Sequence, residues 1–176
     1  MLASNMYLNR HNKIGAYIHW VILKDLGAEV TEQWYNHVPK TSTEVSNHSI
    51  MWDMQILTDA RLSHNRPDIV VHNREKKTCL MIDVAVPQDR NVIKTTAEKI
   101  RRYRDLEIEV QQCWNLNSVR AIPVVVGALG TVNKNITPYL NAISEKIEFK
   151  IVQNIALMGT QRILRNVLRP DVKKQL

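Results

Sequence analysis

The stretch TCLMIDVAV, residues 78–86, sets one carboxylate, Asp83, in an otherwise apolar run. A short continuous apolar run predicts a strand of a buried sheet, and Pro87, which has no backbone N–H to donate, ends that strand. The polar NREKK joins this run to PDIVVH, residues 67–72, so the two runs predict a hairpin. Burying an unpaired ionised carboxylate is costly, so Asp83 needs a buried cation, a basic side chain, an opening to solvent at the strand end, or a metal ion.

The residues before the hairpin predict a helix, a loop and a further strand. Apolar residues recur at helical spacing over residues 6–26, and Gly27 follows them in the position that a helix C-terminus prefers. Residues 28–49 are mixed and polar, ending in KTSTEVSNHS, and predict a loop. The imperfect alternation over residues 52–57 predicts a strand with one protected face.

The residues after the hairpin predict a long helix, a buried strand and closing helices. A stripe of apolar residues at steps of three or four predicts a helix over residues 93–113. AIPVVVGALG, residues 121–130, predicts a strand buried on both faces, in a central or parallel position. Thr137-Pro138 suits a helix start, and residues 151–168 are apolar at helical spacing.

These elements predict a single α/β domain with a mixed sheet over residues 1–176, in the order helix, three strands, helix, strand, then helices. The expected parts are an N-terminal helix over residues 1–27, a core over 50–130 and C-terminal helices over 137–170.

Composition narrows the class of protein. The chain has 176 residues, 44% of them hydrophobic and 23% charged, which excludes collagen-like and wholly disordered chains. Its net charge of +7 favours a polyanionic partner, nucleic acid before membrane. The longest apolar stretch is about half of the ~20 residues that a membrane-spanning helix needs. We therefore expect a soluble intracellular protein without a membrane partner.

Two carboxylates are predicted to meet at one edge of the sheet. Asp68 opens the strand that precedes the one holding Asp83, and 14 residues separate the two. Neighbouring carboxylates repel unless a divalent ion or a shared proton lies between them, and hard oxygen ligands suit Mg²⁺ or Mn²⁺. The alternatives are that Asp68 is a turn residue after Pro67 and that Asp83 has a purely structural partner.

The predicted helix after the hairpin is strongly basic. Its cations could meet phosphates or steady an attacking water, and Lys99 and Tyr103, four residues apart, share one face. The alternative for most of these cations is a solvated helix face. The cations are Arg90, Lys94, Lys99, Arg101, Arg102 and Arg104.

The histidines and tryptophans carry weaker signals. His11 and His19 lie eight residues apart with no third ligand at helical spacing, so they predict capping or contact with a DNA backbone rather than a metal site. The four tryptophans are interpreted as core or interface residues rather than as platforms for base stacking.

Several segments together carry a resemblance to a known family. Arg66-Pro67-Asp68, then 14 residues, Asp83-Val84-Ala85, Glu98-Lys99 and Tyr103 resembles the PD-(D/E)xK nuclease pattern. More closely, the chain resembles the C-terminal restriction-like endonuclease region of reverse transcriptases from site-specific non-LTR retrotransposons. The segments that carry this resemblance are YLNRHN (7–12), IHW (18–20), NRPDIVV (65–71), TCLMIDVAVPQDRNV (78–92), EKIRRY (98–103), IPVVVGALG (122–130) and LMGTQRILRNVL (157–168).

The resemblance implies a restriction-endonuclease-like fold and a metal-dependent DNA nickase, whose freed 3′ hydroxyl primes reverse transcription. Asp68, Asp83 and the backbone carbonyl of Val84 would bind Mg²⁺ or Mn²⁺. Ala85 stands where the D-x-K pattern has its lysine, so the catalytic lysine would be Lys99, supported by Tyr103. The reserve candidate is Lys94.

The resemblance also implies partners. DNA would be bound by Arg66, Lys94, Arg101 and Arg102, with the RNA of the element as a second candidate, and a DNA substrate implies a nuclear location. The family's upstream polymerase and zinc-knuckle motifs are absent from this sequence. The alternative is therefore a catalytically inactive nucleic-acid-binding remnant.

The sequence leaves two other functions open. A non-catalytic binding module would grip phosphates with the basic helix and with Arg162, Arg165 and Arg169 of the C-terminal helix. A structural fragment would present residues 151–168 to a partner.

Overall fold

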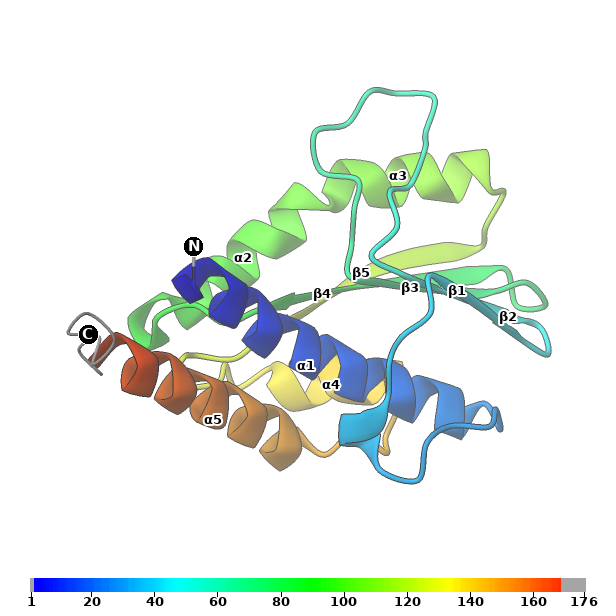
Figure 1. The fold of residues 1–176 in the computed structure, drawn as a ribbon. Coiled ribbons are helices and arrows are strands. Elements are labelled where there is room, and N and C mark those ends of the chain that lie inside the picture. The colour runs from blue at the N-terminus through cyan, green and yellow to red at the C-terminus, as the bar shows by residue number, and fades with distance from the viewer. Residues whose placement is uncertain (1, 169–176) are drawn as a thin grey trace.

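A five-stranded mixed sheet with the strand order β1-β2-β3-β4-β5 forms the centre of the molecule (Figure 1). The computed structural model describes residues 2–168. Strands β1 to β4 pair antiparallel with one another, and β5 lies parallel to β4. The strands are β1 (Ser42–Val45), β2 (His48–Trp52), β3 (Ile69–Asn73), β4 (Thr78–Ala85) and β5 (Ser118–Val125).

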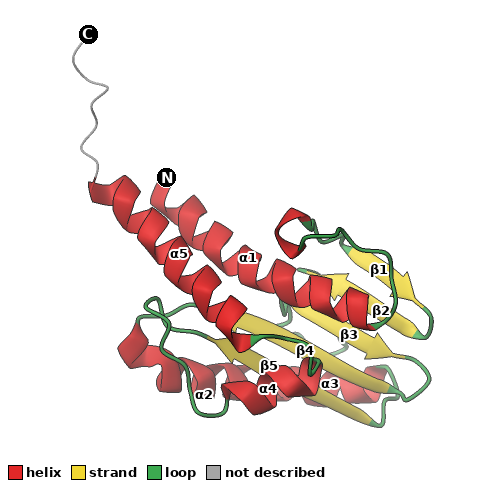
Figure 2. Ribbon diagram, turned by 90° about the horizontal axis from the view of Figure 1, so that it is seen from below, coloured by secondary structure: helices red, strands yellow, loops and turns green. Residues whose placement is uncertain are grey.

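Helices cover both faces of this sheet (Figures 1 and 2). On one face lie α1 (Leu2–Asp25), α4 (Ile136–Ile143) and α5 (Phe149–Leu168), and on the other lie α2 (Val92–Arg102) and α3 (Arg104–Cys113). Short 3-10 turns, η1 (Trp34–Asn36) and η2 (Asp89–Asn91), follow α1 and β4. The predicted mixed α/β architecture is confirmed. No helix within residues 2–168 combines the length and the hydrophobicity needed to cross a bilayer.

The alternation of side chains along β4 divides the core into two clusters. Ile82 and Val84 are buried on the face covered by α1, α4 and α5. Cys79 and Met81 are buried on the opposite face, against Leu106 and other residues of α3. Burying an aliphatic side chain of this size stabilises a fold by about 1.5–3 kcal/mol. Asp83 has the parity of Cys79 and Met81, so the period of two turns it toward α2.

A loop was predicted over residues 28–49; residues 28–41 contain only the short turn η1, but the prediction is wrong for residues 42–49. Residues 42–52 form the β1–β2 hairpin, with Thr43 opposite Ile50 and with Ser46 in the left-handed region at φ 50°. Four strands therefore precede α2 instead of three, and residues 53–57, predicted to be a strand, follow the end of β2. An edge strand such as β1 needs only partial burial, so its polar composition conceals it.

Two further predictions about element boundaries need correction. The helix predicted over residues 93–113 is two helices that meet at Tyr103. Tyr103, Leu106 and Val110 are buried in one cluster, whereas Ile93 and Ile100 of the same predicted stripe are 74% and 39% exposed. The strand predicted at 121–130 is β5, which is parallel as expected but lies at the sheet edge. It is hidden there because α2, α3 and α4 all contact it. The last two residues of the predicted C-terminal helices, Arg169 and Pro170, lie outside the described residues.

Candidate functional site

The β3–β4 hairpin brings Asp68 and Asp83 together. Its register pairs Ile69 with Ile82, so the next residues outward along the antiparallel pair are Asp68 and Asp83. Residues directly opposite each other in an antiparallel pair have Cβ atoms about 4.5–5.5 Å apart. The 14 residues between Asp68 and Asp83 form the hairpin, and its register places the two carboxylates side by side at the end of β4.

Asp68 is held by the backbone of β4 and by His11 of α1. Its Oδ2 accepts hydrogen bonds from the N–H of Val84 at 2.6 Å and from Nε2 of His11 at 3.1 Å. Burial opposes a charged His11 ring, but the hydrogen bond and the charge of Asp68 raise the pKa of His11 to about 9. Burial likewise opposes an ionised Asp68, yet its contacts with His11 and Val84 leave its pKa below the ordinary value.

Asp83 is held by Lys99 of α2. The Lys99 ammonium and the Asp83 carboxylate form an ion pair in which only 13% and 10% of the side-chain surfaces are exposed. Burial raises the pKa of Asp83 to about 6, with a further raising contribution from the neighbouring charge of Asp68 and an opposing one from Lys99. The cation demanded by a carboxylate inside an apolar strand is therefore Lys99 in this structure.

Tyr103 completes this group at the break between α2 and α3. Its hydroxyl donates to the carbonyl oxygen of Arg66 at 3.4 Å. Burial and the charges of the two aspartates raise the pKa of the Tyr103 hydroxyl, which keeps it protonated. Asp83, Lys99 and Tyr103 line one crevice that has no room for a water molecule.

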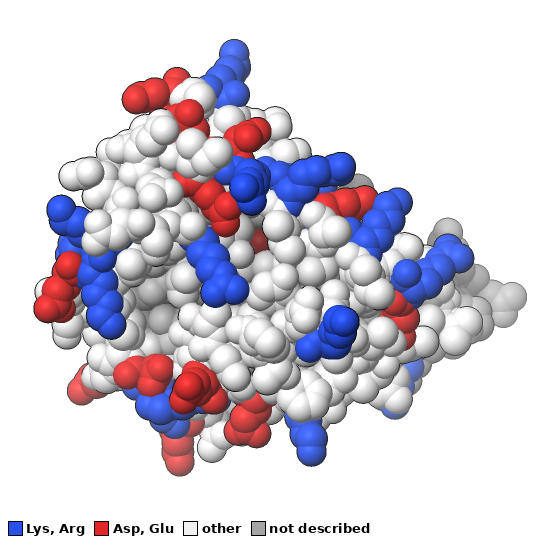
Figure 3. All heavy atoms as spheres, turned by 180° about the vertical axis from the view of Figure 1, so that it is seen from behind, with Lys and Arg blue, Asp and Glu red and all other residues white. Residues whose placement is uncertain are grey.

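The other cations predicted for the site lie apart from the carboxylates. Arg66 is exposed and donates to Asp53 Oδ1 at 2.8 Å. Lys94, the reserve candidate for the catalytic lysine, has 75% of its side chain exposed and lies 3.8 Å from Glu98. Arg101 and Arg102 are exposed at the end of α2. Figure 3 shows basic side chains along the side of the molecule where α2 lies.

His11 is the site residue that sequence reasoning missed. It was predicted to cap a helix or contact DNA, whereas its Nε2 lies 3.1 Å from Asp68 and 3.2 Å from the carbonyl oxygen of Val84. A signal was present, because His11 lies within the YLNRHN segment that carries the family resemblance. Periodicity alone places it on α1 without saying which strand end it meets.

Arg10 anchors the stretch of α1 that carries His11. It is 6% exposed, and its guanidinium donates to Thr160 Oγ1 at 2.7 Å and to the carbonyl oxygen of Val86 at 3.2 Å. Gly159 makes room for this side chain, because a Cβ there would lie 2.5 Å from Cγ of Arg10. The Arg10 contacts thus link α1, α5 and the end of β4.

The loops after β4 and β5 are joined in the same way. Asp89 accepts hydrogen bonds from the N–H of Leu129 and from the hydroxyl of Thr131, both at 2.9 Å. A Cβ at Gly127 would lie 2.1 Å from an oxygen of Asp89. These contacts tie the segment PQDR (87–90) to the segment GALGT (127–131).

Asp68 and Asp83 offer hard oxygen donors of the kind that a divalent cation prefers, and in this structure their charges are balanced by His11 and Lys99. Within residues 2–168 no three or more histidine, cysteine, aspartate or glutamate side chains are grouped to hold a metal ion. Mg²⁺ keeps several waters and needs only one or two carboxylates from a protein. The side chains of Asp68 and Asp83 contact each other. Nε2 of His11 lies within hydrogen-bond distance of both the Asp68 carboxylate and the Val84 carbonyl oxygen. His11 and Lys99 supply the positive charge beside these carboxylates in this structure, and the alternatives for the pair itself are a divalent ion or a shared proton.

The arrangement combines oxygen ligands, a buried lysine and a phenol at one sheet edge beside a basic helix. No protein-family model matches this chain, and no curated protein matches it. A carboxylate pair with an adjacent lysine can bind a cation and also orient or deprotonate a water molecule.

Proposed function

We propose that this chain is a metal-dependent DNA endonuclease domain of a retroelement, acting as a nickase whose freed 3′ hydroxyl primes reverse transcription. The observation that carries the proposal is the convergence at the end of β4 of Asp68, which immediately precedes β3, Asp83 of β4 and Lys99 of α2. The antiparallel strands followed by helices and one parallel strand are compatible with a restriction-endonuclease-like topology.

In this proposal Asp68, Asp83 and the Val84 carbonyl would hold Mg²⁺ or Mn²⁺, which supplies charge neutralisation and an acidified water when bound. His11 keeps Asp68 ionised by donating to it. Lys99 pairs with Asp83 from α2, so its ammonium can orient an attacking water, and after losing its own proton the amine could accept one from that water. Tyr103 borders the crevice and holds its own proton, which suits a hydrogen-bond donor.

The DNA would approach along α2. Arg101 and Arg102 are exposed there and can meet phosphates without carrying sequence information. Arg66 and Lys94 belong to the same proposed surface, although each first has to exchange its carboxylate partner for a phosphate. The polymerase that uses the 3′ hydroxyl, the element RNA and the nuclear location belong to the same proposal.

Nicking of supercoiled plasmid with Mg²⁺ or Mn²⁺, and with EDTA as a blank, tests the proposal. Asp83→Asn keeps the size of the side chain and should reduce nicking to the EDTA background. Asp105→Asn is the matched control, because Asp105 is exposed on α3. Nicking that survives in Asp83→Asn would reject the site.

The choice between the two lysines has its own matched pair. Lys99→Arg keeps a cation beside Asp83 but cannot accept a proton, so we expect a loss of about 100-fold or more in rate. Lys94→Arg keeps a cation on the proposed DNA surface and lies apart from Asp83, so it should leave the rate unchanged. If wild type binds the plasmid without nicking it, and Mg²⁺ binding measured by calorimetry is also absent, the inactive-remnant alternative replaces the proposal.

A further inference from the structure

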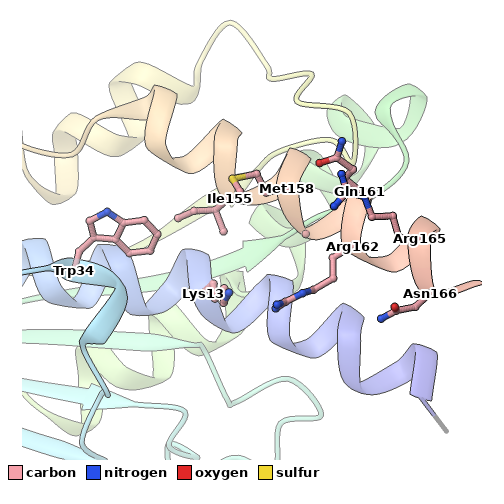
Figure 4. Close-up of a pocket in the computed structure, with 9 residues that line it drawn as sticks. Lys13, Trp34, Ile155, Met158, Gln161, Arg162, Arg165 and Asn166 are labelled. Carbon is pink, nitrogen blue, oxygen red and sulfur yellow. The ribbon is translucent and has the colours of Figure 1, made fainter.

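A groove of about 570 Å³ lies between α1 and α5, away from the carboxylates. Its cationic lining residues are Lys13 of α1 and Arg162 and Arg165 of α5 (Figure 4). Trp34 of η1 lies at one end of the groove, beside Ile155. The groove is therefore assembled from three segments that are far apart in the sequence.

The charge of this groove is of one sign. Residues 2–24 and 149–168, which form nearly all of α1 and α5, contain no aspartate or glutamate. Figure 4 shows Lys13 and Arg162 reaching toward each other from opposite helices. Among the described residues, no carboxylate forms an ion pair with Lys13, Arg162 or Arg165. Neighbouring cations repel, so an anion between them is strongly favoured.

The remaining lining residues suit the bases of a nucleic acid. Trp34 is half-buried, with its ring edge-to-face against Tyr17 at 5.3 Å. Met158 is 70% exposed and adds apolar surface. The side-chain amides of Gln161 and Asn166 are exposed at the groove and can donate and accept hydrogen bonds.

A basic groove with an aromatic side chain is the combination that binds single strands, because phosphates meet the cations and unpaired bases stack on the ring. The volume falls in the range of sites that enclose one drug-sized group. Unpaired nucleotides can enter such a groove, whereas the bases of a duplex stay stacked within the double helix and cannot reach the ring.

We propose that the groove between α1 and α5 binds a single-stranded nucleic acid, with Lys13, Arg162 and Arg165 on its phosphates and Trp34 against a base. This surface goes beyond the proposed cleavage at Asp68 and Asp83, and it does not depend on that chemistry.

The test is fluorescence anisotropy with labelled twelve-nucleotide U and dT strands and a duplex of the same length, in EDTA so that no cleavage occurs. The groove variant carries Lys13→Gln, Arg162→Gln and Arg165→Gln. The control variant carries Lys40→Gln, Lys77→Gln and Lys134→Gln, three exposed lysines outside the groove, so both variants lose the same net charge.

We expect wild type and the control variant to bind a single strand alike and the groove variant to bind it at least about tenfold more weakly. The slope of log affinity against log salt should fall by about 2 in the groove variant, at roughly 0.7 per phosphate contact. Preference for U or for dT identifies RNA or DNA as the source of the strand. The assay contains EDTA and reads binding alone, so a failure of the nuclease proposal would leave this result standing.

A second readout is tryptophan fluorescence. The single strand should quench the emission of wild type, and Trp34→Phe, which keeps an aromatic ring against Tyr17, should lose most of that quenching. Equal affinity of the groove and control variants for single strands would overturn the proposal. It would also be overturned if the duplex bound as tightly as the single strand and lost as much affinity in the groove variant. Self-association that only the groove variant abolishes would overturn it too, because a second copy would then be the occupant.

Discussion

The buried histidine His19 predicts a specific dependence of stability on pH. Its side chain is fully buried, stacks on His37 with Nδ1 2.7 Å from Nε2 of that ring, and lies edge-on to Trp52. Its Nε2 has no hydrogen-bond partner among the described residues. Burial, and then the neighbouring His37, lower its pKa from 6.5 to about 4.

The direction in which His19 changes stability with pH follows from proton binding. Between pH 4 and 6.5 the unfolded chain binds more protons at this position than the folded chain, so acidification favours unfolding. For these two values the linkage relation gives a loss of about 2 kcal/mol between about pH 7.5 and about pH 5 from His19 alone. His11 acts in the opposite direction, because its pKa is raised to about 9 and its stabilisation is lost as pH rises through that value. The total for wild type therefore mixes both signs.

Urea denaturation of wild type and His19→Leu at the two pH values separates them. The difference in unfolding free energy between the two proteins should shift by about 2 kcal/mol, with wild type losing relative stability at the lower pH. His64→Leu is the control, because His64 lies exposed in the loop between β2 and β3, and its difference from wild type should stay constant. A shift below about 0.5 kcal/mol for His19→Leu would refute the account of His19 as a buried, uncharged ring.

Three further predictions concern packing around the site. Gly159→Ala should destabilise the fold by about 1–3 kcal/mol in urea titrations, although alanine normally favours a helix, and the loss should shrink when Arg10 is also shortened to alanine. An additive double variant would contradict the contact. Lys99→Met leaves a buried carboxylate unpaired and should lower the free energy of unfolding by about 3–5 kcal/mol. Lys94→Met should change it by no more than about 0.5 kcal/mol, and equal losses in the two variants would contradict the burial of Lys99. Asp89→Ala removes two hydrogen bonds and should cost about 1–3 kcal/mol and speed amide exchange in the loop after β5, where an unchanged rate would disprove the link.

The pairing of the two aspartates was predictable from local information. Two apolar runs separated by a short polar turn specify a hairpin, and a hairpin register assigns every residue its opposite number. Lys99 on the following helix was also a predicted site residue, but local sequence could not show whether Lys99 or Lys94 meets the carboxylates. Both are lysines of one basic helix, and only the packing of α2 on β5 buries one and exposes the other.

Local patterning of apolar and polar residues was enough to establish the α/β class, most of the helices and the strands of the β3–β4 hairpin, because these depend on neighbours only a few residues apart. The β1–β2 hairpin, the break at Tyr103 and the contact of His11 with Asp68 depend on how whole elements are arranged against one another. His11 and Asp68 are 57 residues apart in the chain. The free energy of such a contact comes from burial and charge in the folded molecule, and no periodicity in the chain encodes it.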